Sequence, residues 1–344
     1  MLAWDEVKKS LPETRSTWFI TGAAGFIGSN LCEFLLKHNQ NVIGLDNLST
    51  GRTSNIKELE SIAASVGISS FKFHEGDIRD YELCKSLIYK SDYVLHQAAL
   101  GSVPRSIKDP ITSNSANVDG TLCMLEACRN SKLERFVFAS SSSVYGSSPE
   151  LPKKEGGEGQ PLSPYAITKV VNEIYAMNYS ALFDLSTVGL RYFNVFGQRQ
   201  DPNGDYAAVI PRWIAKLVNG QVCDIYGDGE TSRDFCYIDN VIQANILAAK
   251  ANLPAGSFTP LNIACGDHTT LNQLYAYIQA ELLNLGAIES ESDPSYLDFR
   301  SGDVRHSLAD ISSAFDKIGY DPEVDVFEGL KRSIRWYVEN LPRN

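Results

Sequence analysis

A glycine-rich turn near the start of the chain limits the possible folds more than any other feature. Residues 18–20 predict a buried strand, and Gly22, Gly25 and Gly28 follow it with the spacing G-x-x-G-x-x-G. Glycine accepts positive φ in a tight turn, lets backbone N–H groups approach a pyrophosphate, and allows a helix to pack closely on a strand. A helix that starts there would direct its free N–H groups at phosphates. The spacing favours a dinucleotide site, although similar turns also occur without a ligand.

A second apolar segment supports the dinucleotide interpretation. Residues 42–45 predict another buried strand, which ends at Asp46, at about the offset where an acidic side chain binds the ribose hydroxyls of adenosine. A carboxylate at this position would repel a 2′-phosphate. The sequence therefore predicts NAD rather than NADP as the cofactor.

The remaining apolar segments predict an α/β fold. Short apolar runs alternate with helical patterns, which is typical of the right-handed βαβ units of a doubly wound parallel sheet. In such a sheet the ligand lies at the carboxyl ends of the strands. We expect further strands at residues 71–74, 93–95, 135–139 and 261–264, and helices at residues 117–129 and 241–250, with one more beginning at Ser163-Pro164 and a short one within residues 1–14.

Composition excludes several classes of function. The chain has 344 residues and a formal net charge of −11, which argues against broad binding to nucleic acid or anionic membranes but allows an anionic substrate held by a few arginines. Its seven cysteines include no C-x-x-C pair and its five histidines lack metal-ligand spacing, so neither a disulfide framework nor a metal site is expected. Because no run of 18 apolar residues occurs, we expect a cytoplasmic protein without membrane segments.

Polar and small residues that follow the predicted strands could contact the dinucleotide. Those after the second strand could line the adenosine side, and those after the third could contact adenine. After the fourth strand, small side chains would let the chain pass close to the cofactor. These residues are Asn47, Ser49, Asp77, Ile78, Gln97 and Ala98.

A tyrosine and a lysine indicate the chemistry of the site. Tyr165 and Lys169 are four residues apart and share one face of the predicted helix. Such a pair is common on helix surfaces, but here Ser141 lies in a serine run at the end of a predicted strand, where ligands bind. A tyrosine with a pKa of about 10 is a weak base at neutral pH. A nearby ammonium group and a positive nicotinamide ring would favour its phenolate, which could remove a proton from an alcohol while hydride leaves the same carbon.

Motifs spread over nearly the whole chain agree with this interpretation. They are TGAAGFIG at 21–28, LDN at 45–47, the serines before VYG at 144–146, SPYAITK at 163–169, LRYFNVFG at 190–197, GDGETSRDF at 227–235 and RSGDVRHS at 300–307. With these motifs the chain resembles the extended short-chain dehydrogenase/reductase superfamily and, within it, UDP-sugar 4-epimerases of the UDP-galactose 4-epimerase type. It is similar to bacterial enzymes that act on UDP-N-acetylglucosamine and UDP-N-acetylgalactosamine. The resemblance implies an NAD-binding Rossmann domain at 15–193 and 235–264, a smaller C-terminal α/β domain that binds UDP-sugar at 194–234 and 265–344, and an N-terminal extension at 1–14.

The resemblance also implies a role for each site residue. Ser141 would hydrogen-bond the sugar 4-oxygen, Tyr165 would act as the base, and Lys169 would bind the nicotinamide ribose and lower the pKa of the tyrosine. The diphosphate and uridine would be held by Asn194, Tyr226, Arg233, Arg300 and Asp303. NAD is expected to stay tightly bound, in contact with Gly22, Gly25, Phe26, Ile27, Gly28, Asp46, Asn47, Ser49, Gly51, Asp77, Ile78, Gln97, Ala98, Asn117, Tyr165, Lys169 and Tyr192. The expected substrate contacts are Gly101, Ser102, Ser141, Ser142, Ser143, Tyr165, Asn194, Ala208, Val209, Tyr226, Arg233, Arg300, Asp303 and Ser307.

Two departures from the family pattern concern the sugar. Many hexose-specific relatives carry a lysine a few residues after the strand that ends at His96, where this chain has Gly101-Ser102, and some carry a tyrosine at the position of Ser307. Smaller residues at both places leave room for an acetamido group. We therefore expect an isomerase that interconverts UDP-N-acetylglucosamine and UDP-N-acetylgalactosamine, or their uronic acids, through a transient 4-keto sugar and without net redox change.

Two other functions stay open. A nucleotide-sugar 4,6-dehydratase or a decarboxylase also makes a 4-keto intermediate, but dehydratases place an acidic pair beside the catalytic serine or threonine, where this chain has Ser142 and Ser143. The other is a non-catalytic protein that binds NAD and UDP-sugar, although such a protein would need no base. The family further implies a homodimer formed through the helices that contain Asn117 and Tyr165, and a supply of precursors for surface polysaccharide is a hypothesis.

Overall fold

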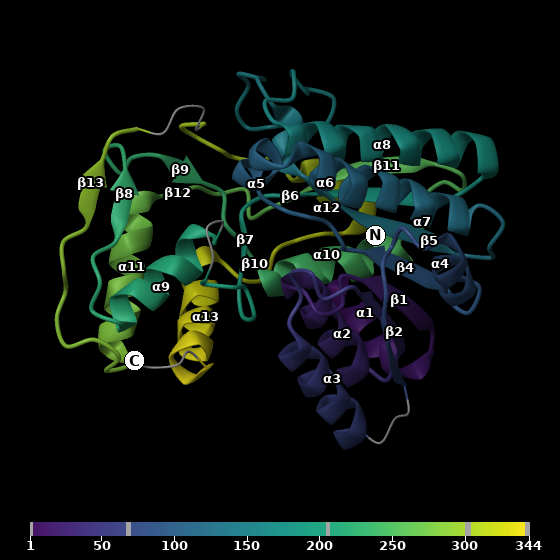
Figure 1. Ribbon diagram of the computed structural model, residues 1–344, viewed down its shortest axis with the longest axis horizontal. Helices are drawn as coiled ribbons and strands as arrows, with labels where there is room; N and C mark the ends of the chain where they lie inside the picture. Colours follow the sequence, from purple (N-terminus) through teal and green to yellow (C-terminus); the bar gives the residue numbers. More distant parts are fainter. Residues whose placement is uncertain (1–2, 67–69, 204–206, 300–303, 341–344) are drawn as a thin grey trace.

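A parallel sheet forms the centre of the larger of two lobes (Figure 1). The computed structural model describes residues 3–66, 70–203, 207–299 and 304–340. The sheet has seven strands in the order β11-β6-β5-β4-β1-β2-β3, which confirms the predicted doubly wound arrangement. The strands are β1 (Thr17–Thr21), β2 (Asn41–Asp46), β3 (Phe71–Glu75), β4 (Tyr93–His96), β5 (Arg135–Ser141), β6 (Thr187–Tyr192) and β11 (Phe258–Ile263).

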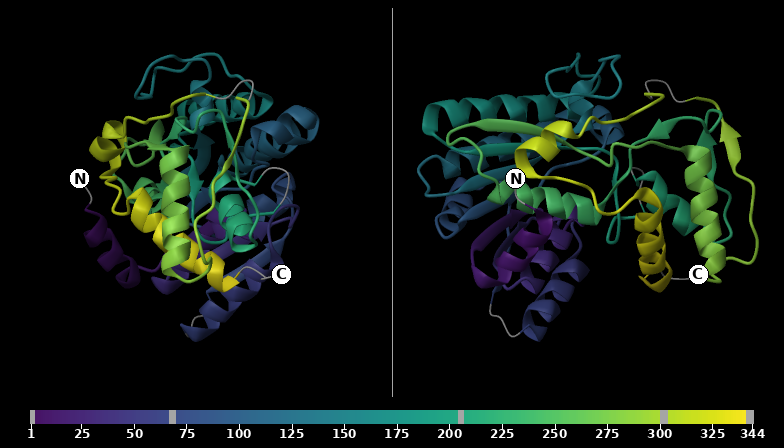
Figure 2. Two further views of the ribbon diagram at one scale, coloured as in Figure 1. Left: turned by 90° about the vertical axis from the view of Figure 1, so that its left-hand side faces the viewer. Right: turned by 180° about the vertical axis from the view of Figure 1, so that it is seen from behind.

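Helices cover both faces of this sheet because its strands are apolar on both sides. Trp18 and Ile20 of β1 belong to one buried cluster, which includes residues of α2, α3 and α10, whereas Phe19 belongs to another, with residues of α4, α7 and α8. Figure 2 shows this layering from two further directions. The helices of the lobe are α1 (Trp4–Ser10), α2 (Phe26–Lys37), α3 (Thr53–Ser65), α4 (Tyr81–Ile88), α5 (Val103–Lys108), α6 (Pro110–Asn114), α7 (Gly120–Cys128), α8 (Pro164–Phe183), α10 (Ile238–Lys250) and α12 (Ser312–Ile318).

Some elements differ from the sequence expectation. Strand β6 is not predicted, because Gly189 interrupts its apolar run; a side chain there would meet the rings of Phe138 and Phe258. The helix expected at 117–129 begins instead with a π-helical turn (Ser115–Asp119) and continues as α7. Two short 3-10 turns, η1 (Leu11–Glu13) and η3 (Ser142–Tyr145), complete the irregular helices.

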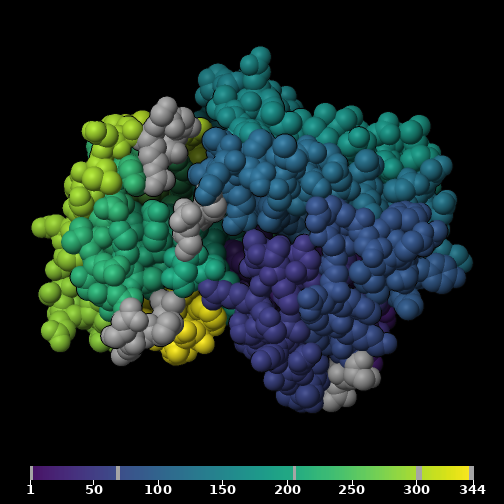
Figure 3. Space-filling view, in the orientation of Figure 1, coloured from purple at the N-terminus to yellow at the C-terminus, as the bar shows by residue number. Residues whose placement is uncertain are grey.

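The smaller lobe is built from short strands and helices, and Figure 3 shows it beside the larger lobe. Within the described residues, its strands form three two-stranded sheets. Helix α12 packs against β11 of the main sheet, although the predicted division assigns it to the smaller domain; the domain boundaries stay a prediction. The remaining elements are β7 (Val195–Phe196), α9 (Val209–Val218), β8 (Asp224–Tyr226), β9 (Ser232–Arg233), β10 (Cys236–Tyr237), β12 (Thr269–Thr270), α11 (Leu271–Asn284), β13 (Ser295–Leu297) and α13 (Val326–Asn340).

The turn between β1 and α2 depends on two glycines. Gly22 has a φ of +70°, and a Cβ there would lie 2.9 Å from the backbone nitrogen of Ala98, which follows the neighbouring strand β4. A Cβ on Gly28 would lie 2.0 Å from the carbonyl oxygen of Gly22. No Cβ tolerates that distance from backbone, so the helix can approach the strand only because residue 28 has no side chain.

We predict that Gly28→Ala lowers the free energy of unfolding by about 1–3 kcal/mol, because the added methyl group overpacks a rigid turn. Alanine is normally about 1 kcal/mol better than glycine inside a helix, so a loss would identify the contact as its cause. Gly101→Ala is the control, since a Cβ there meets no atom within 4 Å. Denaturant unfolding of both variants measures the effect, and equal stabilities would contradict it.

Candidate active site

A cavity of about 320 Å³ lies where the first strands of the main sheet end. Parallel strands place their carboxyl ends at one edge, so segments far apart in the sequence meet there. The first turn of α2 also opens on this cavity, with the backbone N–H groups of residues 26–28 at its N-terminus. The lining residues are Gly22, Gly25, Phe26, Ile27, Gly28, Leu45, Asp46, Asn47, Ser49, Thr50, Gly76, Asp77, Ile78, Gln97, Ala98, Ala99, Leu100, Gly101 and Ala116.

The acidic residue at the end of β2 is held by backbone donors. One carboxylate oxygen of Asp46 accepts from the N–H of Ala24 at 3.0 Å, and the other accepts from the N–H of Leu48 at 2.8 Å. Burial raises the pKa of Asp46, and these two bonds oppose the rise. A Cβ on Gly51 would lie 2.9 and 3.0 Å from the two carboxylate oxygens, so this glycine leaves space for the carboxylate. The cavity, the helix N-terminus and the oriented acid together fit the dinucleotide NAD.

Two residues expected to contact the cofactor have side chains that hold the cavity wall. Asn117 accepts from the N–H of Leu100 at 2.7 Å and donates to the carbonyl oxygen of Leu100 at 3.1 Å and to Thr168 at 3.2 Å. Tyr192 donates to Gln97 at 3.1 Å and accepts from Asn245 at 2.9 Å. Both side chains therefore position the segment after β4.

The catalytic candidates meet where β5 ends and α8 begins. Ser163 caps α8 by accepting from the N–H of Ala166 at 3.1 Å, which places Tyr165 in the first turn. Ser141 is the last residue of β5, and its Oγ accepts from the N–H of Ser143 at 3.1 Å. Burial raises the pKa of Tyr165, whereas a hydrogen bond with Ser141 lowers it. Ser141 therefore acts on the ionisation of Tyr165.

The lysine of this group is buried. Lys169 donates from Nζ to the carbonyl oxygen of Ala139 at 2.7 Å, and its Nζ lies 5.7 Å from the ring centroid of Tyr165. Burial lowers the pKa of Lys169 to about 8, so most of it stays charged at neutral pH. Burial also lowers the pKa of His96 to about 3, and its ring nitrogens bond Thr21 at 2.7 Å and a second threonine at 3.0 Å. The charge of Lys169 also lowers the pKa of His96, so the imidazole stays neutral.

A second cavity of about 320 Å³ lies in the smaller lobe. Three arginines and several aromatic rings line it, which suits a diphosphate next to a flat base. Of the predicted substrate residues, Asn194, Val209, Tyr226 and Arg233 line this cavity, whereas Ala208 and Ser307 do not. The complete lining is Asn194, Val209, Arg212, Trp213, Asp224, Tyr226, Thr231, Arg233, Phe235, Leu271, Phe299 and Arg305.

Sequence reasoning missed two of these arginines. Arg305 lies inside the motif at 300–307, so the motif could have identified it. Arg212 lies in α9, and only the folded structure brings it to this cavity. It lines the cavity together with Arg233 and Arg305. The predicted contacts Arg300 and Asp303 lie outside the described residues.

The residues expected around the sugar come from separate segments of the chain. Gly101 lines the first cavity, and Ser102 follows it with a φ of +89° and caps α5. Ser142 and Ser143 form the start of η3, directly after Ser141. Ser307 donates its backbone N–H to the carbonyl oxygen of Ser232 in β9 at 3.1 Å.

Two features are absent from the described part of the chain. No helix among the described residues is both long and apolar enough to cross a membrane. The same residues contain no cluster of three or more histidine, cysteine, aspartate or glutamate side chains suited to a metal ion.

Known proteins share both the sequence and the fold. Residues 18–264 match the NAD dependent epimerase/dehydratase family. A putative UDP-glucose 4-epimerase of Methanocaldococcus jannaschii is 37% identical over 323 residues, which cover 93% of this chain and 98% of the relative. The structure of UDP-N-acetylglucosamine 4-epimerase from Methanobrevibacter ruminantium M1, in complex with UDP-N-acetylmuramic acid, is 39% identical with a TM-score of 0.86, covering 95% of this chain and 100% of that chain.

A third comparison includes the cofactor. The UDP-glucuronic acid 4-epimerase of Bacillus cereus, solved with UDP-glucuronic acid and NAD, is 31% identical with a TM-score of 0.81 and covers 95% of this chain and 100% of that chain. The resemblance drawn from the motifs and the expectation of NAD are thereby confirmed. This chain belongs to the NAD dependent epimerase/dehydratase family, among its NAD-dependent UDP-sugar 4-epimerases.

Proposed function

We propose that this protein interconverts UDP-N-acetylglucosamine and UDP-N-acetylgalactosamine and keeps its NAD throughout the cycle. The observation that carries the sugar assignment is the open space beside Gly101, where a Cβ would meet no atom within 4 Å. A lysine in some relatives occupies this place, whereas here an acetamido group has room. The small side chain of Ser307 supports the same choice.

Tyr165 is the proposed base. Its pKa is lowered by Ser141, which lies at the end of β5 beside the start of α8, and both residues would contact the 4-hydroxyl of the sugar. Because burial raises the pKa of the tyrosine, its phenolate needs positive charge nearby, which Lys169 supplies from the same face of α8. NAD held in the first cavity would supply the hydride acceptor and, later, the hydride donor at the sugar carbon. Proton removal by Tyr165 and this redox step together give a 4-keto sugar that can be reduced from either face.

The second cavity is the proposed binding site for UDP. Arg212, Arg233 and Arg305 line it and would bind the phosphate oxygens through guanidinium groups, while Tyr226 would lie against the uracil. Binding concentrated on UDP leaves the sugar free to rotate about the diphosphate. The ketone can then present its other face, which inverts the configuration when hydride returns.

The rival dehydratase activity lacks its acid and base. Ser142 and Ser143 occupy the place of the acidic pair, and the N–H of Ser143 is engaged by Ser141. Elimination of water requires a positioned proton donor and acceptor, which these hydroxyls do not supply. UDP-uronic acids and UDP-glucose are alternative substrates, since the Bacillus cereus relative is a UDP-glucuronic acid 4-epimerase and the Methanocaldococcus jannaschii relative is a putative UDP-glucose 4-epimerase.

The activity can be tested without added cofactor. We expect purified protein to convert UDP-N-acetylglucosamine to the galacto epimer, followed by its anomeric proton signals in NMR. Tyr165→Phe should bind UDP-sugar but lose about 10²–10⁴-fold in kcat, because it has no base. Parallel samples contain UDP-glucose and UDP-glucuronic acid. The proposal would be contradicted if UDP-glucose or UDP-glucuronic acid were converted and UDP-N-acetylglucosamine were not. It would also be contradicted if no UDP-sugar were converted even with added NAD.

The acetamido pocket can be tested at one position. We expect Ser307→Tyr to reduce kcat/KM for the acetylated pair by about 10-fold or more relative to UDP-glucose and UDP-galactose, because the ring removes space. Ser307→Thr is the control, since it adds only a methyl group. An equal loss on both pairs of substrates would show that residue 307 does not select the sugar.

We further propose a homodimer formed through α5, α6 and α8, whose exposed apolar side chains point to a covered face. Ile111 is 81% exposed, and Ile167, Ile174 and Met177 recur at helical spacing on α8 while staying about half exposed. The area is shared by adjacent helices, since α6 packs against α8.

We expect the unmodified protein to sediment as a dimer in sedimentation velocity. Ile174→Glu should sediment as a monomer, because a buried unpaired carboxylate opposes association. Tyr89→Glu is the matched control, since Tyr89 is 86% exposed at the end of α4, away from this face. A monomeric unmodified protein, or a dimer unaffected by Ile174→Glu, would refute this interface.

A further inference from the structure

A buried ion pair lies directly behind the catalytic serine. Arg191 is the penultimate residue of β6, in register with Ser140, and is 3% exposed. Its Nε donates to Oε1 of Glu173 at 3.0 Å, and its Nη2 donates to Oε2 at 2.7 Å. A guanidinium group that binds both oxygens of one carboxylate fixes the orientation of both groups.

The acidic partner lies on the same helix as the catalytic tyrosine and lysine. Tyr165, Lys169 and Glu173 follow one another at intervals of four residues in α8, so they share one helical face. All three act on the last three residues of β5: Lys169 donates to the carbonyl oxygen of Ala139, Glu173 accepts from the hydroxyl of Ser140 at 2.5 Å, and Ser141 lowers the pKa of Tyr165. Consecutive strand residues are thus joined to successive turns of one helix.

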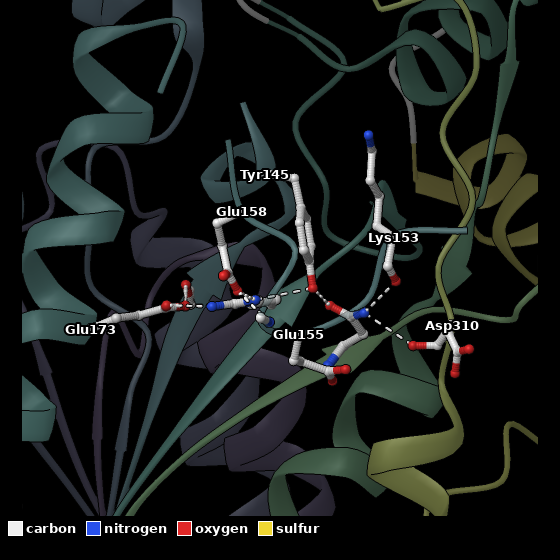
Figure 4. A network of polar contacts seen from close by, with 10 residues as sticks. Tyr145, Lys153, Glu155, Glu158, Glu173 and Asp310 are labelled. Atoms are coloured by element: carbon white, nitrogen blue, oxygen red, sulfur yellow. Dashed lines mark hydrogen bonds and ion pairs between the residues drawn. The ribbon is translucent and has the colours of Figure 1, made fainter. Parts of the chain in front are cut away.

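The other side of Arg191 extends this network toward β11 and the segment before α12 (Figure 4). Its Nη1 donates to the hydroxyl of Tyr145 at 3.0 Å and pairs with Glu158. Tyr145 donates to Asn262 at 2.6 Å, and Asn262 donates to the carbonyl oxygens of Lys153 at 2.9 Å and of Asp310 at 3.0 Å. The ion pair therefore occupies the centre of a continuous hydrogen-bonded chain.

The charges around Lys169 come from several elements. Glu173 is the anion on its own helix, Tyr165 is neutral in the protein alone because burial raises its pKa, and His96 on β4 is neutral because burial lowers its pKa to about 3. Arg191 on β6 lies behind Glu173 and balances its charge. Burial lowers the pKa of Lys169, and Glu173 opposes this effect.

We propose that Glu173, oriented by Arg191, is a positioning residue that holds Lys169 and the end of β5 in the arrangement needed for proton removal by Tyr165. This inference rests on the proposed function of Tyr165 and Lys169. Glu173 contacts neither substrate nor cofactor in this role. It acts through the ammonium group of Lys169 and through the hydroxyl of Ser140.

The test compares Glu173→Gln with the unmodified protein, each as purified with its NAD. In protein carrying ¹³C-labelled lysine, the Cε signal of Lys169, assigned with Lys169→Met, reports its titration directly. We expect the titration midpoint to fall by about one pH unit in Glu173→Gln, since a neighbouring anion favours the charged lysine. The pH profile of kcat should shift in the same direction. Because kcat falls as pH rises through the lysine pKa, this fall should begin at lower pH in Glu173→Gln, whereas KM should change little.

Tyr179→Phe is the matched control. It removes a hydrogen bond of 2.8 Å to Glu126 from the same helix, farther from the site, so it should shift neither the titration midpoint nor the pH profile of kcat. A Lys169 midpoint that is the same in Glu173→Gln and in the unmodified protein overturns the inference. The titration needs no turnover, so it is informative even if no UDP-sugar is converted, which would refute only the proposed function.

A milder variant covers the case in which Glu173→Gln does not fold. Ser140→Ala removes one hydrogen bond to Glu173 and leaves the ion pair in place. We expect kcat to fall by about 3- to 10-fold with unchanged KM, which lies in the range of the usual net contribution of one hydrogen bond. An unchanged kcat in Ser140→Ala would overturn the inference, as would a change confined to KM.

Discussion

Parallel pairing of the seven strands decides where polar groups can gather in this molecule. Every strand of the main sheet ends at the same edge, so Gly22, Asp46 and Ser141 lie along it despite their separation in sequence. Between β3 and β4 the chain crosses to the other side of β1, which places Ala98 against Gly22. This crossing forms the cofactor cavity. Residue 22 must be glycine because a side chain there would collide with the backbone of Ala98.

Because the charged side chains at this edge are buried, each needs a partner group that stabilises its charge to stay ionised. Lys169 keeps its charge near neutral pH although it is buried, and Glu173 counteracts the effect of burial. A buried ion pair such as Glu173 with Arg191 typically adds little net stability, whereas removal of one member costs about 3–5 kcal/mol. Such a pair therefore enforces one arrangement of β5, β6 and α8 more than it strengthens the fold.

The local part of the fold and site could be predicted from the sequence, whereas its long-range part could not. The glycine turn, the strand ends and the spacing of Tyr165 and Lys169 follow from neighbouring residues and helical periodicity. Strand β6 escapes such reasoning because Gly189 is explained only by rings packed on it from other strands. Arg212 and Glu173 likewise acquire their partners from distant segments, which no local pattern reports.

The path of the chain between the lobes limits how the molecule can be divided. After β6 the chain enters the smaller lobe, returns for α10 and β11, leaves again for α11, and comes back with α12 before it ends with α13. A fragment that stops at residue 193 would expose the edge of β6 that β11 pairs, together with the apolar surface that α10 covers. Unpaired edges of this kind promote aggregation. A chimera that exchanges the smaller lobe between relatives must therefore be joined at several points.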